Sequence, residues 1–380
     1  MRKIVRRCLD IQLPSGKSAF LWGPRKTGKS YWIHHAFPDA TVIDLLKTDV
    51  FAEYVVRPAL LRERFAGHSQ LIVIDEVQMA PDLLNEVHGL MESHGQSFLL
   101  TGSSARKLRR SHANLLGGRA WRYEMRPLIF RETNGFDLES IMISGLVPPH
   151  YLSPNPVADL RAYVGDYLKE EISAEAQVRN IPSFSEFLRV SAVTNGELLN
   201  YTNVAREAGV SAKVARGYFE ILEDTLLGYR VQPWKRAKSR RLIETEKFYW
   251  FDVGVANFLS RRTPRPGTPE FGKAFEHYIL MELMAWRSYR QPDMPLAFWR
   301  TASGFEVDFI LDDFKAAIEV KAGARIHDGD LSPLRALRGE HTVGRACVVC
   351  LETIPRKTAD GISILPWQHF LEQLWGGDIA

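Results

Sequence analysis

The residues with the most recognisable chemistry lie near the start of the chain, in the stretch GPRKTGKS. This stretch fits the spacing GxxxxGK[ST], follows the apolar run SAFLW and leads into YWIHHAF, which favours a helix. Glycines let backbone N–H groups surround phosphates, Lys29 reaches the β and γ oxygens, and the Ser30 hydroxyl is a ligand for Mg²⁺. We therefore expect ATP and Mg²⁺ as cofactors. The expected nucleotide-binding residues are Gly23, Pro24, Arg25, Lys26, Thr27, Gly28, Lys29, Ser30 and, from a later strand, Asp75.

A second motif, LIVIDEVQ, places the acids Asp75 and Glu76 after four apolar residues. At the carboxyl end of a buried parallel strand, Asp75 would hold Mg²⁺, with Ser30 as a further metal ligand, and Glu76 would orient and deprotonate a water molecule. An activated water favours hydrolysis over transfer of a phosphoryl group to a metabolite. The alternative is a strand that ends in a solvated acidic turn.

A third strand, SFLLTGSS, adds two hydroxyl groups and precedes several arginines. Thr101 and Ser103 share a strand face by period-two alternation, so either could sense the γ-phosphate or position the water. Arg119 is the first candidate for an arginine finger supplied by a neighbouring subunit, which would imply a homo-oligomer, and Arg122 and Arg106 compete with it. Loop arginines are more often simply solvated.

The elements that position these residues indicate an α/β protein of several parts. The 380 residues carry a formal net charge of +4, so nucleic-acid contacts should come from a local patch. Short apolar runs alternate with helical segments over 1–150, helical spacing dominates 151–245, and strands return over 246–380. No stretch is long enough for a signal peptide or a membrane span, so we expect a cytoplasmic protein without membrane contact. Cys347 and Cys350 lie in ACVVCLETI, which is typical of a buried strand.

The order of motifs GPRKTGKS, LIVIDEVQ, LLTGSSARKL, LLGGRA and RPLIFRE resembles a bacterial and archaeal family of AAA+-like ATPases whose C-terminal domain was formerly of unknown function. The resemblance continues through GLVPPHYLS, YVGDYLKEEI and KFYWFDVGVANFL. It implies a P-loop parallel-sheet core with an additional strand, a helical winged-helix middle segment and an α/β domain similar to PD-(D/E)xK restriction endonucleases. Asp252, in the last motif, is a further candidate acid to which physical reasoning assigns no role.

The middle segment contains NVAREAGVSAKVARGYFEILEDT, which has helix-turn-helix spacing. We expect a turn at Gly209, an N-cap at Ser211 and apolar Val214, Phe219 and Leu222 on the second helix. Contacts with DNA are expected from Lys213 and Arg216, and from a basic wing tip that contains Lys235, Arg236, Lys238, Arg240 and Arg241. The alternative is a module that packs against another protein or subunit.

The terminal segment has the residue types of a PD-(D/E)xK site. Glu276 shares a helical stripe with Leu280 and Leu283, which predicts that it faces the packed side of the helix. Asp308 in FEVDFIL alternates with Phe305, Val307, Phe309 and Leu311, and AIEVKAG places Glu319 and Lys321 on one face.

The three acids of this segment would hold one or two Mg²⁺ ions, and Lys321 would position or activate a water molecule that attacks a phosphodiester. Alternatively, the acids persist as a salt-bridge cluster around Lys321 in an inactive docking or DNA-binding module.

Taken together, these residues predict Mg²⁺-dependent ATP hydrolysis coupled to the binding and remodelling of DNA. A second hypothesis is a nucleotide-controlled switch that holds a protein partner and performs no chemistry on nucleic acid. A third is a nuclease whose cutting is licensed by ATP.

Overall fold

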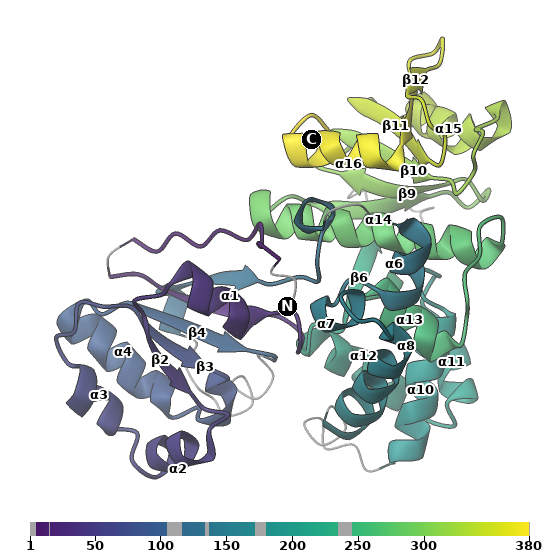
Figure 1. The fold of residues 1–380 in the computed structure, drawn as a ribbon. Helices are drawn as coiled ribbons and strands as arrows, with labels where there is room; N and C mark the ends of the chain where they lie inside the picture. Colours follow the sequence, from purple (N-terminus) through teal and green to yellow (C-terminus); the bar gives the residue numbers. More distant parts are fainter. Residues whose placement is uncertain are drawn as a thin grey trace. The chain divides into compact units, whose positions relative to one another are not determined.

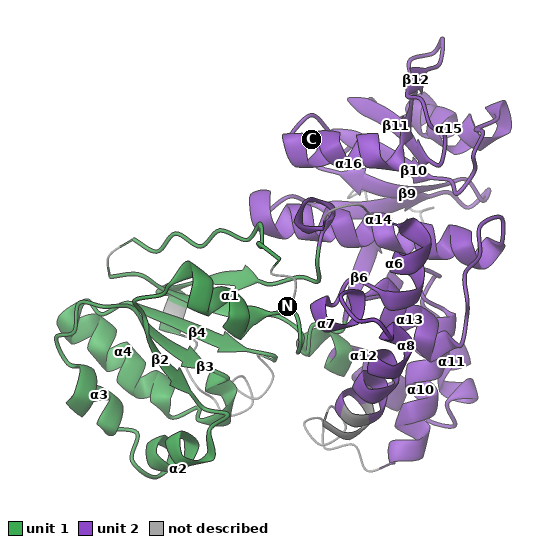
Figure 2. Cartoon of the chain, viewed as in Figure 1, with its two compact units in different colours: residues 1–128, 221–227 green, residues 129–220, 228–380 purple. Residues whose placement is uncertain are grey.

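The computed structural model describes residues 5–14, 16–104, 116–133, 137–171, 180–234 and 245–379, and divides the chain into two compact units (Figure 2). The first unit comprises Met1–Leu128 with Ile221–Leu227, and the second comprises Ile129–Glu220 with Gly228–Ala380. The division into segments 1–150, 151–245 and 246–380 stays a prediction.

A parallel sheet of five strands in the order β2-β3-β4-β1-β5 forms the centre of the first unit (Figure 1). The strand β4 lies between β1, which precedes GPRKTGKS, and β3, which ends in Asp75. This is the additional strand that the family resemblance implied. The strands are β1 (Ser18–Trp22), β2 (Thr41–Asp44), β3 (Ile72–Asp75), β4 (Phe98–Gly102) and β5 (Ala120–Glu124). The helices are α1 (Lys29–Ala36), α2 (Thr48–Val56), α3 (Leu60–Phe65) and α4 (Leu83–His94), with short turns η1 (Val77–Met79) and η2 (Leu116–Gly118).

The three central strands β1, β3 and β4 are buried on both faces, as expected for a parallel sheet that helices cover on both sides. Phe20, Ile74 and Leu100 belong to one buried cluster with Leu61 of α3 and Leu90 of α4. The intervening apolar residues of these three strands point to the opposite face and are also fully buried. Parallel strands end at the same edge, so the loop after β1, the acids that end β3 and the hydroxyls of β4 are brought to one edge.

The second unit begins with helices, most of which start at a side chain that accepts hydrogen bonds from the first turn. Asp137, Asn155, Asn180, Asn200, Asp252 and Thr268 are such caps. The elements are η3 (Phe130–Glu132), α6 (Leu138–Ser144), α7 (Pro148–Tyr151), α8 (Pro156–Ala162), the π-helical η4 (Tyr163–Glu171), α10 (Ile181–Val193), α11 (Tyr201–Glu207), α12 (Ala212–Asp224) and α13 (Val253–Ser260). The last residues of α12, from Ile221 on, are counted with the first unit.

A mixed sheet of eight strands in the order β12-β13-β11-β10-β9-β8-β6-β7 follows. The strands β6 and β7 form an antiparallel pair, and β6 also pairs with β8, so the strand that follows the helix-turn-helix extends the C-terminal sheet. The strands are β6 (Gly228–Pro233), β7 (Lys247–Trp250), β8 (Leu296–Arg300), β9 (Glu306–Leu311), β10 (Ala316–Val320), β11 (Arg345–Cys350), β12 (Arg356–Lys357) and β13 (Ser363–Pro366). The helices are α14 (Pro269–Arg290), α15 (Ser332–Glu340) and α16 (Trp367–Gly376), with the turn η5 (Asp328–Leu331).

Two apolar residues named in the sequence patterns are exposed. Val214 is 39% exposed, because Ala215, Phe219 and Leu222 form the buried stripe of α12. Phe305 is 42% exposed, because it lies in the turn before β9 and outside the alternating strand.

The buried strand expected around the two C-terminal cysteines is confirmed. Cys347 and Cys350 lie on the buried strand β11 as free thiols, and burial raises their pKa values to about 12 and about 11.

Among the described residues of the chain, none of the helices has both the length and the apolar character that crossing a membrane requires.

Candidate functional site

The loop from Gly23 to Gly28 depends on glycine at both ends. A Cβ atom at Gly23 would lie 2.5 Å from the carbonyl oxygen of Met125, and Gly28 has a φ of +94°, in the left-handed region. The helix α1 begins directly after Gly28, with Lys29 as its first residue. Backbone N–H groups of the loop and of the first turn of α1 are therefore the groups available to an anion at this position.

The Lys29 ammonium group is buried against the loop itself. Its Nζ donates to the carbonyl oxygens of Gly23 at 2.7 Å and Pro24 at 3.2 Å. Burial lowers the pKa of Lys29, and the negative charges of Glu76 and Asp75 oppose that effect. The lysine thus lies within the loop where a phosphate group would be held.

The acids that end β3 are held by hydroxyl groups. Ser30 Oγ donates to Asp75 Oδ2 at 2.6 Å, and the Thr101 hydroxyl donates to Asp75 Oδ1. The backbone N–H of Glu76 donates to Thr101 Oγ1 at 3.3 Å, and Ser103 Oγ lies 3.4 Å from Glu76 Oε2. The structure therefore brings Ser30, Asp75, Glu76, Thr101 and Ser103 together.

Glu76 has an unusual backbone conformation for a residue with a side chain. Its φ is 60° and its ψ is 46°, which is the left-handed region, directly after the strand ends. Such a conformation costs free energy and persists where the surroundings impose it, often at functional sites. Glu76 is nevertheless buried, and its carboxylate lies beside the hydroxyl group of Ser103.

Sequence reasoning missed Gln78, which lies in the quoted motif LIVIDEVQ. Its Nε2 donates to Glu76 Oε2 and also to Ser103 Oγ at 3.2 Å. Gly102 makes room for it, because a Cβ atom there would lie 2.3 Å from Gln78 Oε1. The amide fixes the carboxylate of Glu76 without adding a charge.

Arg7 is a second residue that the motifs did not reveal. Its guanidinium donates to the carbonyl oxygens of Thr27 at 2.6 Å, Arg126 at 2.6 Å and Pro127 at 3.1 Å. It thereby ties the phosphate-binding loop to the segment that follows β5. Its only sequence signal was membership of a basic cluster near the N-terminus.

The candidate arginine fingers are not gathered with the acids. Arg119 is exposed and pairs with Glu92 at 2.8 Å, and Arg122 is exposed on β5. Arg106 lies outside the described residues. A finger from a neighbouring subunit stays a prediction.

The residues of this edge fit MgATP. A hydroxyl and a carboxylate oxygen lie 2.6 Å apart at the start of α1, and such hard oxygen ligands are those that Mg²⁺ prefers. The loop offers a lysine and a glycine-lined backbone for phosphates. Ser30 and Asp75 would hold the metal ion, and Lys29 would contact the phosphates.

The basic residues predicted to contact DNA are only partly described. Lys213 and Arg216 are exposed on α12 and line an open hollow of about 740 Å³ together with Tyr201. The Arg216 guanidinium lies 4.8 Å from the centre of the Tyr201 ring. The turn at Gly209 and the Ser211 cap are present, since Ser211 Oγ accepts from the N–H of Val214 at 3.3 Å.

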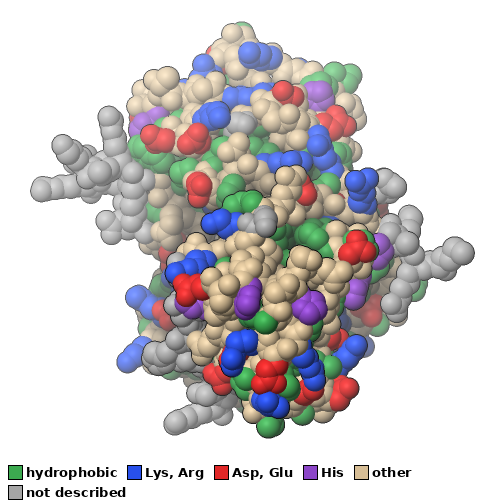
Figure 3. Space-filling view, turned by 90° about the vertical axis from the view of Figure 1, so that its left-hand side faces the viewer, with side chains coloured by type: hydrophobic (Ala, Val, Ile, Leu, Met, Phe, Trp, Pro, Cys, Tyr) green, Lys and Arg blue, Asp and Glu red, His purple; other side chains and the backbone are tan. Residues whose placement is uncertain are grey.

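The five basic residues of the predicted wing tip, Lys235, Arg236, Lys238, Arg240 and Arg241, lie outside the described residues. The face shown in Figure 3 has basic and acidic side chains interspersed and no continuous basic band among the residues drawn in colour.

The acidic side chains of the terminal segment form ion pairs with lysine side chains. Glu319 pairs with Lys321 at 2.5 Å, and Asp308 Oδ2 accepts from the backbone N–H of Val320 at 2.8 Å. Burial raises the pKa of Glu319 to about 7 despite Lys321. Burial and then the negative charges of Glu319 and Glu276 raise the pKa of Asp308 well above its ordinary range. These four predicted residues therefore do lie close together.

Lys247, which sequence reasoning missed, supplies the main positive charge among them. Its Nζ lies 2.5 Å from Glu306 and 3.5 Å from Glu276, and its side chain is only 4% exposed. Burial by itself would lower the pKa of Lys247, but Glu276, Asp308 and Glu306 raise it above its ordinary value. An ammonium group thus occupies the surroundings in which a metal ion was expected.

This arrangement does not fit a divalent cation. Among the described residues, no three histidine, cysteine, aspartate or glutamate side chains form a group that could hold a metal ion. Of the carboxylate oxygens, Glu319 Oε2 is buried without a partner, whereas Glu319 Oε1 pairs with Lys321 and Asp308 Oδ2 pairs with a backbone N–H. A hard cation needs several oxygen ligands at once.

The fully buried acid of α14 is Glu282 and not Glu276. Glu276 is 21% exposed in its side chain, whereas Glu282 is 1% exposed. Glu282 accepts from the N–H of Phe130 at 2.7 Å and from Trp375 Nε1 at 2.9 Å, and burial raises its pKa to about 8.

Asp252 has a structural explanation. Its side chain caps α13 by accepting from Val255 N–H at 3.0 Å, and it accepts from Leu146 N–H at 2.7 Å. A Cβ atom at Gly145 would lie 2.0 Å from Asp252 Oδ1, so the motifs GLVPPHYLS and KFYWFDVGVANFL meet here. Burial raises the pKa of Asp252 to about 6.

Comparison with protein families agrees with the geometry of the first unit. Residues 15–134 match the AAA domain family. Residues 135–265 match one domain of unknown function (DUF8612), and residues 271–370 match another (DUF4143). The segment that contains the phosphate-binding loop is therefore an AAA domain. Two domains of unknown function follow it, and neither match names a nuclease.

Similar full-length proteins carry no functional description. Uncharacterized proteins of Mycobacterium bovis and Mycobacterium tuberculosis are each 27% identical to this chain over 305 residues, which is 77% of this chain and 67% of theirs. Among solved structures, the Aeropyrum pernix ORC1 protein in complex with DNA is 13% identical, covering 64% of this chain and 86% of its own, with a TM-score of 0.28.

A signal-transduction ATPase with a tetratricopeptide-repeat sensor from Pyrococcus horikoshii is also 13% identical, covering 72% of this chain and 47% of its own, with a TM-score of 0.21. Scores this low carry no information about what this chain binds.

Proposed function

We propose that this protein hydrolyses ATP in the presence of Mg²⁺ at the edge of the parallel sheet. One observation carries the proposal: hydroxyl and amide groups donate hydrogen bonds to the carboxylates of Asp75 and Glu76, beside the loop that runs from Gly23 to Gly28. Asp75 and Glu76 are deeply buried, and the described hydrogen bonds to their carboxylates come from neutral groups, while Lys29 acts on them through its charge alone. Buried carboxylates are normally paired or coordinate a metal ion.

Each residue has a defined task in this reaction. Lys29 and the loop N–H groups bind the phosphates, and Ser30 and Asp75 hold the metal ion. When bound, Mg²⁺ supplies positive charge that offsets the charge of the phosphate oxygens. Gln78 and Ser103 hold Glu76 in position, and Glu76 accepts a proton from the attacking water. Thr101 contacts Asp75, which places it between the metal ligand and Glu76.

Steady-state ATP hydrolysis by purified protein tests this proposal. We expect Lys29→Ala to abolish nucleotide binding, measured with a fluorescent ATP analogue, and therefore hydrolysis. The matched control is Lys47→Ala, which removes an exposed lysine of the same domain. Equal hydrolysis by the wild type and Lys29→Ala would refute the proposal.

We further propose that hydrolysis is coupled to DNA through the helix-turn-helix of α11 and α12. The exposed side chains of Lys213 and Arg216 support this, because they share one hollow with an aromatic ring and hydroxyl groups. Contacts of this kind with phosphates give salt-dependent and weakly sequence-specific binding.

Measuring DNA affinity over a range of salt concentrations tests this coupling. Replacing Lys213 and Arg216 by alanine should weaken binding to all sequences and lower the salt slope by about 1 for each lost phosphate contact. Arg290→Ala, at the exposed end of α14, is the control. Glu76→Gln should retain DNA while hydrolysis stops. Unchanged affinity in the double variant would instead favour the protein-partner switch.

For the terminal domain, we propose the inactive form of the nuclease-like hypothesis. The ion pairs of Lys247 and Lys321 with the acids support a structural cluster. Incubation of DNA with Mg²⁺ or Mn²⁺ and ATP should give no cleavage. Cleavage that depends on Lys321 would refute this assignment.

A further inference from the structure

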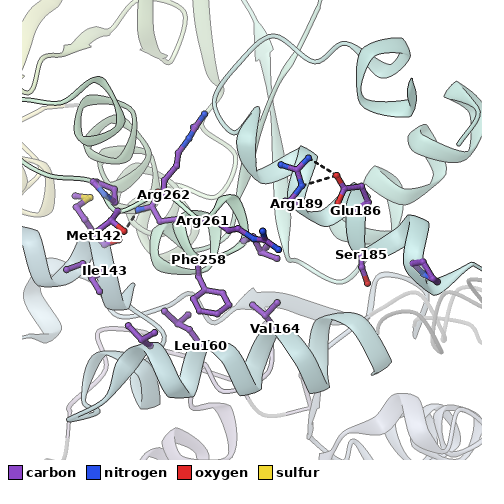
Figure 4. Close-up of a pocket in the computed structure, with 16 residues that line it drawn as sticks. Met142, Ile143, Leu160, Val164, Ser185, Glu186, Arg189, Phe258, Arg261 and Arg262 are labelled. Atoms are coloured by element: carbon purple, nitrogen blue, oxygen red, sulfur yellow. Dashed lines mark hydrogen bonds and ion pairs between the residues drawn. The ribbon is translucent and has the colours of Figure 1, made fainter. Parts of the chain in front are cut away.

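A cavity of about 650 Å³ lies among the helices of the second unit, and its lining residues include neither the acids of the terminal segment nor residues of α11 and α12 (Figure 4). The helix α13 packs against α6, α8 and α10 around it. Leu160 and Val164 project from α8 and η4 toward Phe258 of α13, and Met142 of α6 completes an apolar floor. The volume is in the range of sites that hold ligands or anchoring side chains.

Apolar surface continues from the floor onto the rim of the cavity. Ile143 is 41% exposed and Val157 is 42% exposed, and both line it. Ile181, which is 49% exposed, precedes the lining residue Pro182. Exposed apolar side chains that adjoin a cavity are typical of a surface that receives another protein segment. A small enclosed molecule would not cover this rim.

The lining of the cavity carries a net positive charge, because the arginines Arg189, Arg261 and Arg262 face the single acid Glu186, whose charge interacts with Arg261. Arg189 is paired with Glu186, through two hydrogen bonds of 2.9 and 2.6 Å to one carboxylate oxygen. Arg261 and Arg262 also line the cavity, and within the described part of the chain their side chains have no hydrogen-bonded or ion-paired partner. A ligand with carboxylates beside an apolar group would complement this charge.

The backbone conformation of Arg261 indicates that its side chain has a role other than stabilising the end of the helix. It ends α13 in the left-handed conformation, with a φ of 55°. Glycine is the usual residue at this position of a helix terminus, because a Cβ atom is unfavourable there. An arginine therefore stands where glycine would give a more stable helix end, next to a second arginine at the same cavity.

We propose that this cavity is a docking site for a segment of a partner protein that presents a large apolar side chain next to acidic residues. The apolar side chain enters the space between Leu160, Val164 and Phe258. Its acidic neighbours pair with Arg261 and Arg262. The site is independent of the proposed ATP hydrolysis.

Selection from a random-peptide display library against the full-length protein tests the proposal. We expect enriched peptides to share an apolar residue flanked by aspartate or glutamate. The best peptide should bind about tenfold more weakly to the double variant Arg261→Gly, Arg262→Ala and should lose affinity as salt increases. The thermal midpoint of Arg261→Gly should not fall, since glycine suits that backbone conformation.

Two further variants separate the site from general surface effects. Ile143→Asp, on the exposed rim, should also weaken the peptide about tenfold. Arg290→Ala, which removes an exposed arginine from another helix end, should leave its affinity unchanged. Enriched peptides without acidic residues, equal affinity for the arginine double variant, or no enrichment would each overturn the proposal. Binding of the dye 1-anilinonaphthalene-8-sulfonate without any peptide would assign the cavity to a small amphipathic anion instead.

Discussion

The two acid clusters of this protein differ in what neutralises them. At the proposed ATP site, the described hydrogen bonds to the carboxylates of Asp75 and Glu76 come from hydroxyl and amide groups. The nearby Lys29 interacts with the two acids through its charge, but its hydrogen bonds are to carbonyl oxygens of its own loop. In the terminal domain, Lys247 and Lys321 pair directly with the acids.

This difference distinguishes a site that needs a ligand from one that does not. Neutral donors hold carboxylates in place and leave their charge available for an incoming cation. A buried ammonium group cancels that charge permanently, and removing it leaves buried acids without compensation. The same residue type therefore supports opposite functional conclusions in the two domains.

The largest effect should come from Glu76→Gln. Glutamine keeps the shape but cannot accept the proton from water, so hydrolysis should fall by about 10² to 10⁴-fold while ATP remains bound. Steady-state hydrolysis and binding of a fluorescent ATP analogue measure the two quantities. A rate within a factor of about two of the wild type would show that Glu76 is not the base and would weaken the contrast between the clusters.

Lys247→Met should destabilise the second unit by about 3–5 kcal/mol, because Glu276, Glu306 and Asp308 lose a buried partner. Lys273→Met removes an ion pair with Glu197 in which both side chains are nearly half exposed, and it should cost less than about 1 kcal/mol. Thermal or urea unfolding followed by tryptophan fluorescence compares the two. Equal costs would mean that Lys247 does not hold the cluster together.

Glu282 is a third kind of buried acid, which neither a metal ion nor a lysine neutralises. Its described partners include no basic side chain, so we expect its carboxyl group to be neutral because it binds a proton. Its pKa is raised from 4.5 to about 8, so its contribution to stability is fully present below about pH 4.5 and is lost as the pH rises through about 8. Between about pH 5 and 8.5, Glu282→Gln should reduce the pH dependence of unfolding by roughly 1–3 kcal/mol. Unfolding curves across this range measure it, with Glu270→Gln on the exposed start of α14 as the control. An unaltered slope would argue against a protonated Glu282.

The smallest effect is expected from Lys321→Met. The Lys321 side chain is 38% exposed, and Lys247 remains to offset the acids, so stability should fall by about 1 kcal/mol or less. ATP hydrolysis should be unchanged. A loss of several kcal/mol, or of a metal-dependent activity, would make Lys321 the centre of this cluster.

Much of the proposed ATP site could be predicted from the sequence, because its residues lie within short motifs or at the ends of neighbouring parallel strands. A fixed loop spacing defines Lys29 and Ser30, and parallel strands end at one edge, so period-two alternation was enough to associate Thr101 and Ser103 with Asp75. The role of Gln78 was not predicted, because its contacts depend on the left-handed backbone conformation of Glu76, which the sequence pattern does not reveal.

The terminal cluster was harder to predict because it depends on contacts between distant strands. Lys247 reaches Glu306 across the sheet that β6 and β8 join, and nothing near Lys247 in the sequence signals an acid partner. Similarly, the helical stripe on α14 indicated Glu276, whereas the packing of Phe130 and Trp375 selects Glu282 for full burial.

Mn²⁺ binding tests the contrast between the two acid clusters most directly. The electron paramagnetic resonance signal of Mn²⁺ measures this binding, with and without a non-hydrolysable ATP analogue. We predict tight binding only with the nucleotide, greatly weakened by Asp75→Asn and unchanged by Glu319→Gln. Tight Mn²⁺ binding without nucleotide that Glu319→Gln abolishes would contradict the account, because the terminal acids would then hold a metal ion.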